Sequence, residues 1–206
     1  MNKKAASHLS KVDRHLRRVI RKVGPGDVSF PRGVNPYKTL VTAVAHQQLT
    51  GKAANTILGR VIALYPGKKF PTPEDLVRTP DAQLRAAGFS RAKVAAVKDI
   101  AAKTLDGVVP SVRAMARMSD GDIIDRLTSI RGVGPWTVEM MLIFTLGRPD
   151  VLPATDYGVR KGFAMTYALR ELPTPKEVLA FGERWKPHRS AAAWYLWRAT
   201  EVLGTP

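Results

Sequence analysis

Residues 122–144, DIIDRLTSIRGVGPWTVEMMLIF, carry the clearest structural pattern of the chain. Apolar residues recur at helical spacing on both sides of its centre, first Ile123, Ile124, Leu127 and Ile130, then Val138, Met141, Leu142 and Phe144. Between them, Gly132 and Gly134 permit positive φ, and Pro135 suits the first position of a helix. The stretch therefore predicts a helix, a tight glycine turn and a second helix.

The turn of this hairpin is suited to bind a phosphate group. Backbone N–H groups of the turn and of the following helix N-terminus lack partners within a helix and converge on one spot. We therefore expect Gly132, Val133, Gly134 and Thr137 to contact phosphate groups. An ordinary connection between two helices is the alternative, since short Gly-x-Gly turns are common.

Helical periodicity extends over almost the whole chain, so the predicted fold is all-α. A first basic helix is expected to end at Gly24, and Ser90 and Ser119 are candidate helix caps. The one candidate for an extended segment is a short piece around Val28 and Phe30. We expect a single domain with two helical lobes around a cleft. Residues 1–35 and the helices from about 156 form one lobe, and residues from about 36 to 155 form the bundle that carries the hairpin.

Composition narrows the class of protein. The 206 residues carry 33 Lys and Arg against 17 Asp and Glu, a formal net charge of +16, which favours a nucleic-acid partner over an anionic membrane or a merely basic surface. The lack of Cys excludes disulfides, a cysteine-ligated iron–sulfur cluster, a thiolate zinc site and a Cys nucleophile. Neither a signal peptide nor a membrane span is evident, so we expect a soluble, cytoplasmic protein.

Several motifs together resemble one family. LTSIRGVGPWTVEMM, residues 127–141, resembles the hairpin of the helix-hairpin-helix DNA glycosylase superfamily, and LGRPDVLPATDYGVRKGF, residues 146–163, supplies its Gly/Pro-rich loop followed by an aspartate. AVAHQQLTGKAA, GFSRAKVAAVKDIA and ERWKPHRSAAAWYLWRATE resemble the alkylpurine branch, 3-methyladenine glycosylase II. The resemblance covers residues from about 37 to 203 and implies the helix-hairpin-helix-GPD fold.

This resemblance implies that Asp156 is the catalytic carboxylate. Breaking the bond between deoxyribose C1′ and a base nitrogen develops positive charge on the sugar, which a nearby carboxylate stabilises while it orients the attacking water. The alternative for Asp156 is a helix cap, a role that Thr155 could also fill. No second carboxyl stands out as a general acid, because Glu139 and Asp150 suit surface or capping roles better. An alkylated purine is already cationic and leaves as a neutral base, so it needs little acid assistance.

The same resemblance implies a base pocket walled by Trp136, Met140, Tyr157 and Trp197. Aromatic faces attract an electron-poor, cationic base through stacking and cation–π contact, whereas core packing is the alternative for each aromatic residue. Met140 replaces a frequent aromatic residue of the family, which would make the pocket roomier. Trp136 stands where strand-cleaving branches carry a lysine nucleophile, so we expect a monofunctional enzyme without lyase activity.

Other expected DNA contacts also rest on the resemblance. Leu49 would be a wedge in the DNA stack and Gln48 would face the opposite strand, although a Leu usually belongs to the core. Arg131, Lys161 and Arg189 would contact phosphates, with solvated charge as the alternative. The expected cation is a monovalent Na⁺ or K⁺, held by hairpin carbonyls of Thr128, Ile130 and Gly132; no cofactor is required.

The expected function is excision of alkylated purines, of the 3-methyladenine and 7-methylguanine type, from duplex DNA by a monomeric glycosylase. Base flipping would precede hydrolysis, and an abasic site would remain for base excision repair. Two alternatives stay open at this point. The chain could be a non-catalytic DNA-binding protein that uses the hairpin as a phosphate clamp, or a glycosylase for deaminated or oxidised bases. We expect the sheet-rich N-terminal domain found in some members of the branch to be absent here.

Overall fold

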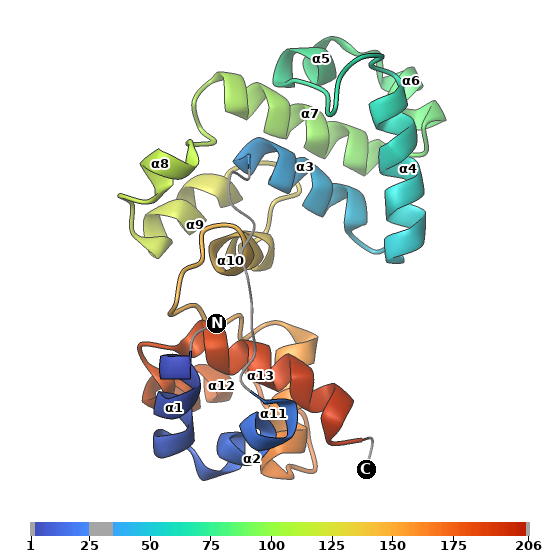
Figure 1. Ribbon diagram of the computed structural model, residues 1–206. Coiled ribbons are helices and arrows are strands. Elements are labelled where there is room, and N and C mark those ends of the chain that lie inside the picture. The colour runs from blue at the N-terminus through green and yellow to red at the C-terminus, as the bar shows by residue number, and fades with distance from the viewer. Residues whose placement is uncertain (1–2, 25–34, 205–206) are drawn as a thin grey trace. The chain divides into compact units, whose positions relative to one another are not determined.

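A computed structural model describes residues 3–24 and 35–204 of the chain, and every regular element within these ranges is helical (Figure 1). The predicted all-α class is therefore confirmed, while the segment around Val28 and Phe30 lies outside the described residues. The helices are α1 Lys3–Val12, α2 Arg14–Val23, α3 Pro36–His46, α4 Gly51–Ala63, α5 Pro73–Arg78, α6 Asp81–Ala86, α7 Arg91–Leu105, α8 Val112–Met115, α9 Asp120–Thr128, α10 Pro135–Phe144, α11 Tyr157–Tyr167, α12 Pro175–Gly182 and α13 Arg189–Val202, with a 3₁₀ turn at Glu183–Trp185.

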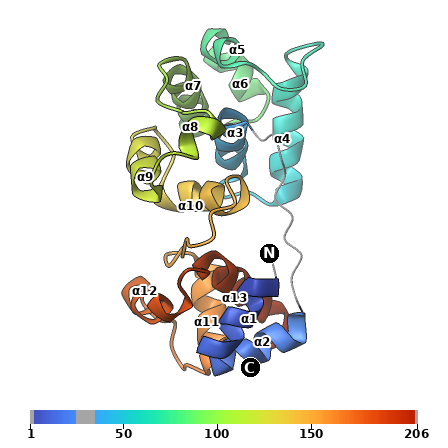
Figure 2. The same cartoon turned by 60° about the vertical axis from the view of Figure 1, so that its left-hand side comes forward.

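The helices form two compact units (Figures 1 and 2). One unit contains the described residues of Met1–Pro31 and Leu142–Pro206, and the other contains those of Arg32–Met141. The sequence predicts the second boundary near residue 156, whereas the structure assigns residues 142–155 to the unit with the C-terminal helices. The reason is packing, because Leu152 and Ala154 are buried in the apolar core of that unit. The cleft expected between two lobes stays a prediction.

Local signals place the helix starts where the sequence predicts them. The Ser90 side chain accepts a hydrogen bond from the Lys93 N–H, and Ser119 forms a reciprocal capping box with Asp122. Each cap satisfies a backbone N–H that has no partner inside the helix. These two caps orient α7, which lies beneath the hairpin, and α9, which leads into it.

The predicted single basic helix near the N-terminus is in fact two helices. The chain breaks at Asp13, whose extended backbone (φ −143°) starts α2 and whose carboxylate accepts N–H bonds from His15 and Leu16. The same buried carboxylate also accepts hydrogen bonds from the Tyr167 hydroxyl and, at 2.9 Å, from Trp185 Nε1. Burial, and then the hydrogen bond to Asp13, raise the pKa of Tyr167. The break thus places this buried carboxylate where four donors satisfy it.

Helices α11 and α13 cross at very short range in the unit that contains the termini. Gly162 of α11 lies against the α13 backbone, where a Cβ atom on Gly162 would lie 1.9 Å from the Leu196 carbonyl oxygen. Only a residue without Cβ fits this contact. The crossing matters for the site because Asp156 directly precedes α11 and Trp197 lies on α13.

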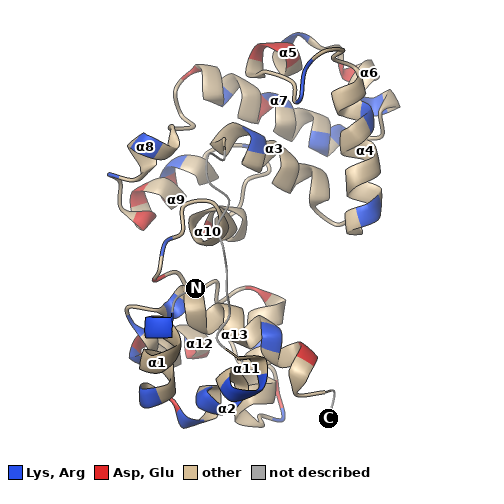
Figure 3. Ribbon diagram, in the orientation of Figure 1, with Lys and Arg blue, Asp and Glu red and all other residues tan. Residues whose placement is uncertain are grey.

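Basic residues concentrate on the first two helices. Residues 3–24 contain eight Lys and Arg and a single acidic residue, Asp13 (Figure 3). Because Asp13 is buried, no exposed acidic side chain of α1 or α2 lies beside the exposed cations of α2. No helix among the described residues is long and apolar enough to cross a membrane.

Candidate functional site

Asp156 occupies the N-terminus of α11 and caps it. Its Oδ1 accepts the Val159 N–H at 2.8 Å, so the cap role belongs to Asp156 and not to Thr155, which is exposed. The carboxylate is nevertheless half-buried and not enclosed in the core. Capping and chemistry are therefore compatible here, because the cap holds the carboxylate at the surface in one orientation.

A second hydrogen bond connects Asp156 to Trp197. The indole Nε1–H donates to Oδ1 at 2.7 Å, across 41 residues of sequence. Gly158 makes this approach feasible, because a Cβ there would lie 2.8 Å from Trp197 Cδ1 and 3.1 Å from Asp156 Oδ1. On its other side the indole stacks on Phe144, with ring centroids 5.7 Å apart. Trp197 thus contacts Gly158 and Phe144 and lies beside the Asp156 carboxylate.

Two of the other predicted pocket aromatics lie outside the core. Tyr157, next to Asp156, is 66% exposed, and Trp136 is 44% exposed. Trp136 and Met140 line a cavity of about 390 Å³ within the unit that carries the hairpin. The end of α3 and the following loop contribute Ala43, His46, Gln47 and Gln48 to its wall, and α10 also contributes Thr137. Core packing, the alternative for Trp136 and Tyr157, does not describe these two side chains.

The hairpin is a β-turn that rests on α7. The Val133 N–H donates to the Ile130 carbonyl at 3.1 Å, with Gly132 at φ +78° between them. Gly132 is required twice over, since a Cβ there would also lie 2.7 Å from Cβ of Ala96 on α7. From the other side, Gln47 Nε2 donates to the Gly132 carbonyl at 3.0 Å.

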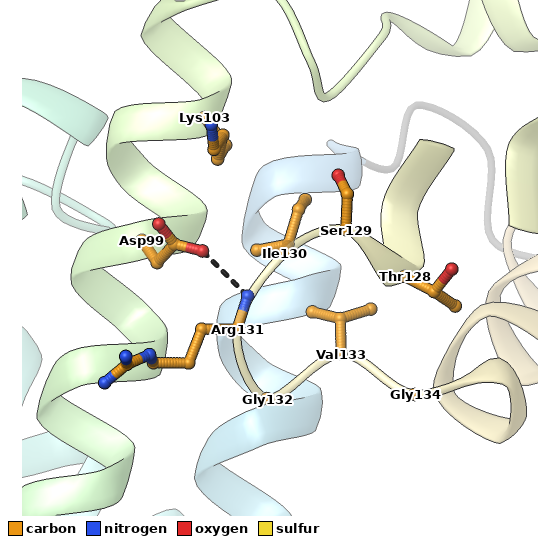
Figure 4. Close-up of a pocket in the computed structure, with 9 residues that line it drawn as sticks. All are labelled: Asp99, Lys103, Thr128, Ser129, Ile130, Arg131, Gly132, Val133 and Gly134. Carbon is orange, nitrogen blue, oxygen red and sulfur yellow. Dashed lines mark hydrogen bonds between the residues drawn. The ribbon is translucent and has the colours of Figure 1, made fainter. Parts of the chain in front are cut away.

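These bonds decide which N–H groups of the turn are left for a phosphate. The Arg131 N–H donates to Asp99 Oδ2 at 2.7 Å, and the Val133 N–H is used within the turn (Figure 4). Within the described part of the chain, the N–H groups of Gly132 and Gly134 have no acceptor. Val133 contributes a buried side chain that anchors the turn.

The Thr137 hydroxyl is not placed to contact a phosphate at the hairpin. The Thr137 side chain is buried and lines the cavity beside Trp136, and it does not line a second cavity that the hairpin residues 128–134 form with Asp99 and Lys103. Its N–H lies in the first turn of α10, where helices bind anions. A contact from Thr137 would therefore come from its backbone.

The predicted wedge lies in the loop between α3 and α4. Leu49 is 40% exposed, so it does not belong to the core. Gln48 is exposed and has φ +57°, a conformation that few residues other than glycine adopt. The loop thus presents both side chains to solvent immediately before Thr50, which caps α4.

Arg189 does not offer the free charge that a phosphate contact requires. Its guanidinium binds both carboxylate oxygens of Asp150 and also contacts Glu183. This ion pair fixes the start of α13 next to the Pro-rich loop. It also engages Asp150, one of the two carboxyls considered as a general acid. Lys161 is half-buried on α11.

Sequence reasoning missed several residues that shape this site. Gln47 and Asp99 bind hairpin residues that are 85 and 32 residues away. Gly158 leaves room for Trp197 on the neighbouring helix α13. One local signal existed, since Gly158 and Gly162 are four residues apart on α11 and so share a helix face. The polar contacts of Gln47 and Asp99 had no such signal.

Comparison with known proteins identifies the class to which this fold and site belong. Residues 41–188 match the HhH-GPD superfamily of base excision DNA repair proteins. The chain is 41% identical over 202 residues to DNA-3-methyladenine glycosylase 1 of Schizosaccharomyces pombe, covering 97% of this chain and 88% of that protein. The chain therefore belongs to the HhH-GPD superfamily, and the predicted fold and role in base excision repair are confirmed.

Solved structures extend this similarity to the alkylpurine branch. The S. pombe 3-methyladenine DNA glycosylase Mag1 in complex with abasic DNA matches with a TM-score of 0.87 and 41% identity, over 98% of this chain and 100% of that chain. DNA-3-methyladenine glycosidase from Bacillus halodurans matches with a TM-score of 0.84 and 32% identity, over 99% and 90%. The predicted resemblance to this branch is confirmed.

Proposed function

We propose that this protein is a monofunctional DNA N-glycosylase that removes alkylated purines from duplex DNA and leaves an abasic site. The observation that carries the proposal is the half-buried Asp156 carboxylate, held at the start of α11 beside the Trp197 indole. Family membership and relatives named as 3-methyladenine glycosylases support it. We further propose that it acts as a monomer in the cytoplasm.

The chemistry follows from what the carboxylate can and cannot do. As the C1′–N bond breaks, the sugar gains positive charge, and the ionised Asp156 stabilises it and orients the attacking water. Of the two carboxyls considered as donors of the proton that a normal base needs on leaving, Asp150 is bound by Arg189, and Glu139 lies on α10 of the other unit. A base methylated at N3 or N7 leaves as a neutral molecule and needs no such proton. This requirement selects cationic purines.

Aromatic surfaces beside Asp156 supply a second basis for selection. Trp197 and the exposed Tyr157 belong to the same unit as Asp156, and we assign both to the wall that receives the flipped base. Cation–π attraction contributes about 0.5–2 kcal/mol per contact, which favours a charged base over a neutral one. The predicted pocket roles of Trp136 and Met140, which belong to the other unit, stay predictions. Trp136 in place of a lysine supports hydrolysis without strand cleavage.

A release assay tests this function. We expect duplexes with one 3-methyladenine or 7-methylguanine to lose the base, with no nick until mild alkali cleaves the abasic site. Duplexes with 8-oxoguanine, uracil or an undamaged purine at the same position serve as controls. Release confined to oxidised or deaminated bases would contradict the proposal, as would a covalent adduct trapped by borohydride, which indicates a lysine nucleophile.

The same assay bears on the cation expected at the hairpin. Thr128, Ile130 and Gly132 line one cavity, but the carbonyls of Ile130 and Gly132 already accept hydrogen bonds, and Lys103 and Arg131 add positive charge. Each carbonyl oxygen keeps a second lone pair, but the positive charges of Lys103 and Arg131 oppose a cation in the free protein. We propose that Na⁺ or K⁺ binds there only together with a DNA phosphate. Replacing Na⁺ by tetramethylammonium at equal ionic strength should then slow release from duplex DNA without lowering thermal stability.

Gly134→Ala isolates the proposed hairpin–phosphate contact. A Cβ at Gly134 would meet no atom within 4 Å and the backbone there is not left-handed, so we expect unchanged thermal stability. The methyl group would obstruct the approach of a phosphate to the turn, and loss of charge-assisted hydrogen bonds should weaken binding about 10-fold or more. Fluorescence anisotropy with an undamaged duplex measures this. Gly132→Ala is the contrasting variant, because it should destabilise the fold. Wild-type affinity in Gly134→Ala would show that DNA does not approach this turn.

A further inference from the structure

Asp99 lies in the middle of α7, directly beneath the hairpin. Its Oδ2 accepts the Arg131 N–H at 2.7 Å, the first N–H of the turn (Figure 4). One turn earlier on the same helix, Ala96 contacts Gly132 so closely that no Cβ would fit between them. The hairpin is therefore fixed on α7 by one small residue and one acidic residue.

Asp99 is also the one acidic residue at the cavity beside the hairpin. This cavity, of about 700 Å³, is lined by residues 128–134 together with Asp99 and Lys103. Within the described part of the chain, neither Lys103 nor the Arg131 side chain forms an ion pair. Two cations and two N–H groups thus favour an anion in this cavity, while one fixed carboxylate opposes it.

We infer that Asp99 is a positioning residue with two effects of opposite sign on DNA binding. By holding the Arg131 N–H, it fixes the turn whose Gly132 and Gly134 N–H groups remain available for a phosphate. By its negative charge, it weakens phosphate binding at that turn and so speeds the release of undamaged DNA. The inference rests on the proposed hairpin–phosphate contact.

The magnitudes favour a balance between the two effects. Two unit charges several ångströms apart at a solvated surface change affinity by about two- to fivefold, and salt screens this term. The hydrogen bond to a backbone N–H should contribute a factor of similar size, because a loosened turn must be ordered again on binding. Only the first effect depends on charge, so a neutral isostere separates them.

Two substitutions make the test. Asp99→Asn removes the charge and retains an oxygen that can accept the Arg131 N–H, whereas Asp99→Ala removes both. With an undamaged duplex, we expect Asp99→Asn to bind about two- to fivefold tighter than wild type in 50 mM salt, with slower dissociation and a smaller difference in 200 mM salt. Asp99→Ala should bind about threefold or more weaker than Asp99→Asn. Equal affinity of Asp99→Asn and wild type, or of the two variants, would overturn the inference.

Matched controls keep the outcome interpretable. Asp106→Asn makes the same charge change at the exposed end of α7, outside the cavity, and should leave affinity unchanged. Thermal melting reports whether each variant folds. Gly134→Ala separates the two hypotheses. If it weakens binding while Asp99→Asn behaves as wild type, only the role of Asp99 fails. If Gly134→Ala binds as wild type, the hairpin contact fails and the inference with it.

Discussion

Asp156→Asn is expected to lower the rate of base release from an alkylated duplex by about 10²–10⁴-fold, because a neutral amide cannot stabilise the cationic sugar or take a proton from water. The change is nearly isosteric. The amide oxygen of Asn can accept the N–H bonds that Val159 and Trp197 now donate to Oδ1, so the cap of α11 should persist. Single-turnover release at saturating enzyme measures the effect, and anisotropy should show unchanged DNA binding.

Two further variants sharpen this expectation. Trp197→Phe keeps an aromatic wall and removes the donor to Asp156, so it should lower release far less than Asp156→Asn. Glu171→Gln removes an exposed carboxylate of the same unit and should behave as wild type. Release by Asp156→Asn within tenfold of wild type would mean that another group performs the chemistry. A wild type that binds DNA and releases no lesion would instead favour the non-catalytic alternative.

The parts of the fold that could be predicted from sequence are those that depend on neighbouring residues. Ser90 and Ser119 cap helices through N–H groups three residues away, and the glycine turn at 132–134 lies between two periodic segments. Such contacts need no tertiary structure, so the pattern shows them. The break at Asp13 is only partly of this kind, because its carboxylate caps α2 through His15 and Leu16. Its other two donors, Tyr167 and Trp185, are 154 and 172 residues away and leave no local signal.

The candidate site likewise has parts that the sequence predicts and parts that depend on tertiary contacts. Motif resemblance names Asp156 and Trp197, but not the hydrogen bond that joins them or the Gly158 that permits it. The sequence also presents capping and catalysis as alternatives for Asp156. The structure shows the cap, and the proposal needs the same carboxylate held by it, so the two roles do not compete.

Gly162→Ala is expected to destabilise the protein more than Gly132→Ala or Gly134→Ala. The added Cβ would lie 1.9 Å from the Leu196 carbonyl oxygen and 3.1 Å from its Cα, both backbone atoms that cannot rotate away. Helices α11 and α13 must separate, at a cost of about 3 kcal/mol. In a chain of this size the melting midpoint should fall by about 6–12 °C, which calorimetry or circular dichroism measures.

The same separation should reduce catalysis in the protein that remains folded. Asp156 moves with α11 and Trp197 with α13, so their 2.7 Å hydrogen bond cannot survive a shift of about 1 Å at the crossing. Gly59→Ala is the matched control, because a Cβ there meets nothing within 4 Å and alanine favours the helix. It should leave release unchanged and stabilise α4 by about 0.5–1 kcal/mol. If Gly162→Ala melted and excised like Gly59→Ala, the close crossing of α11 and α13 would not be what positions Asp156.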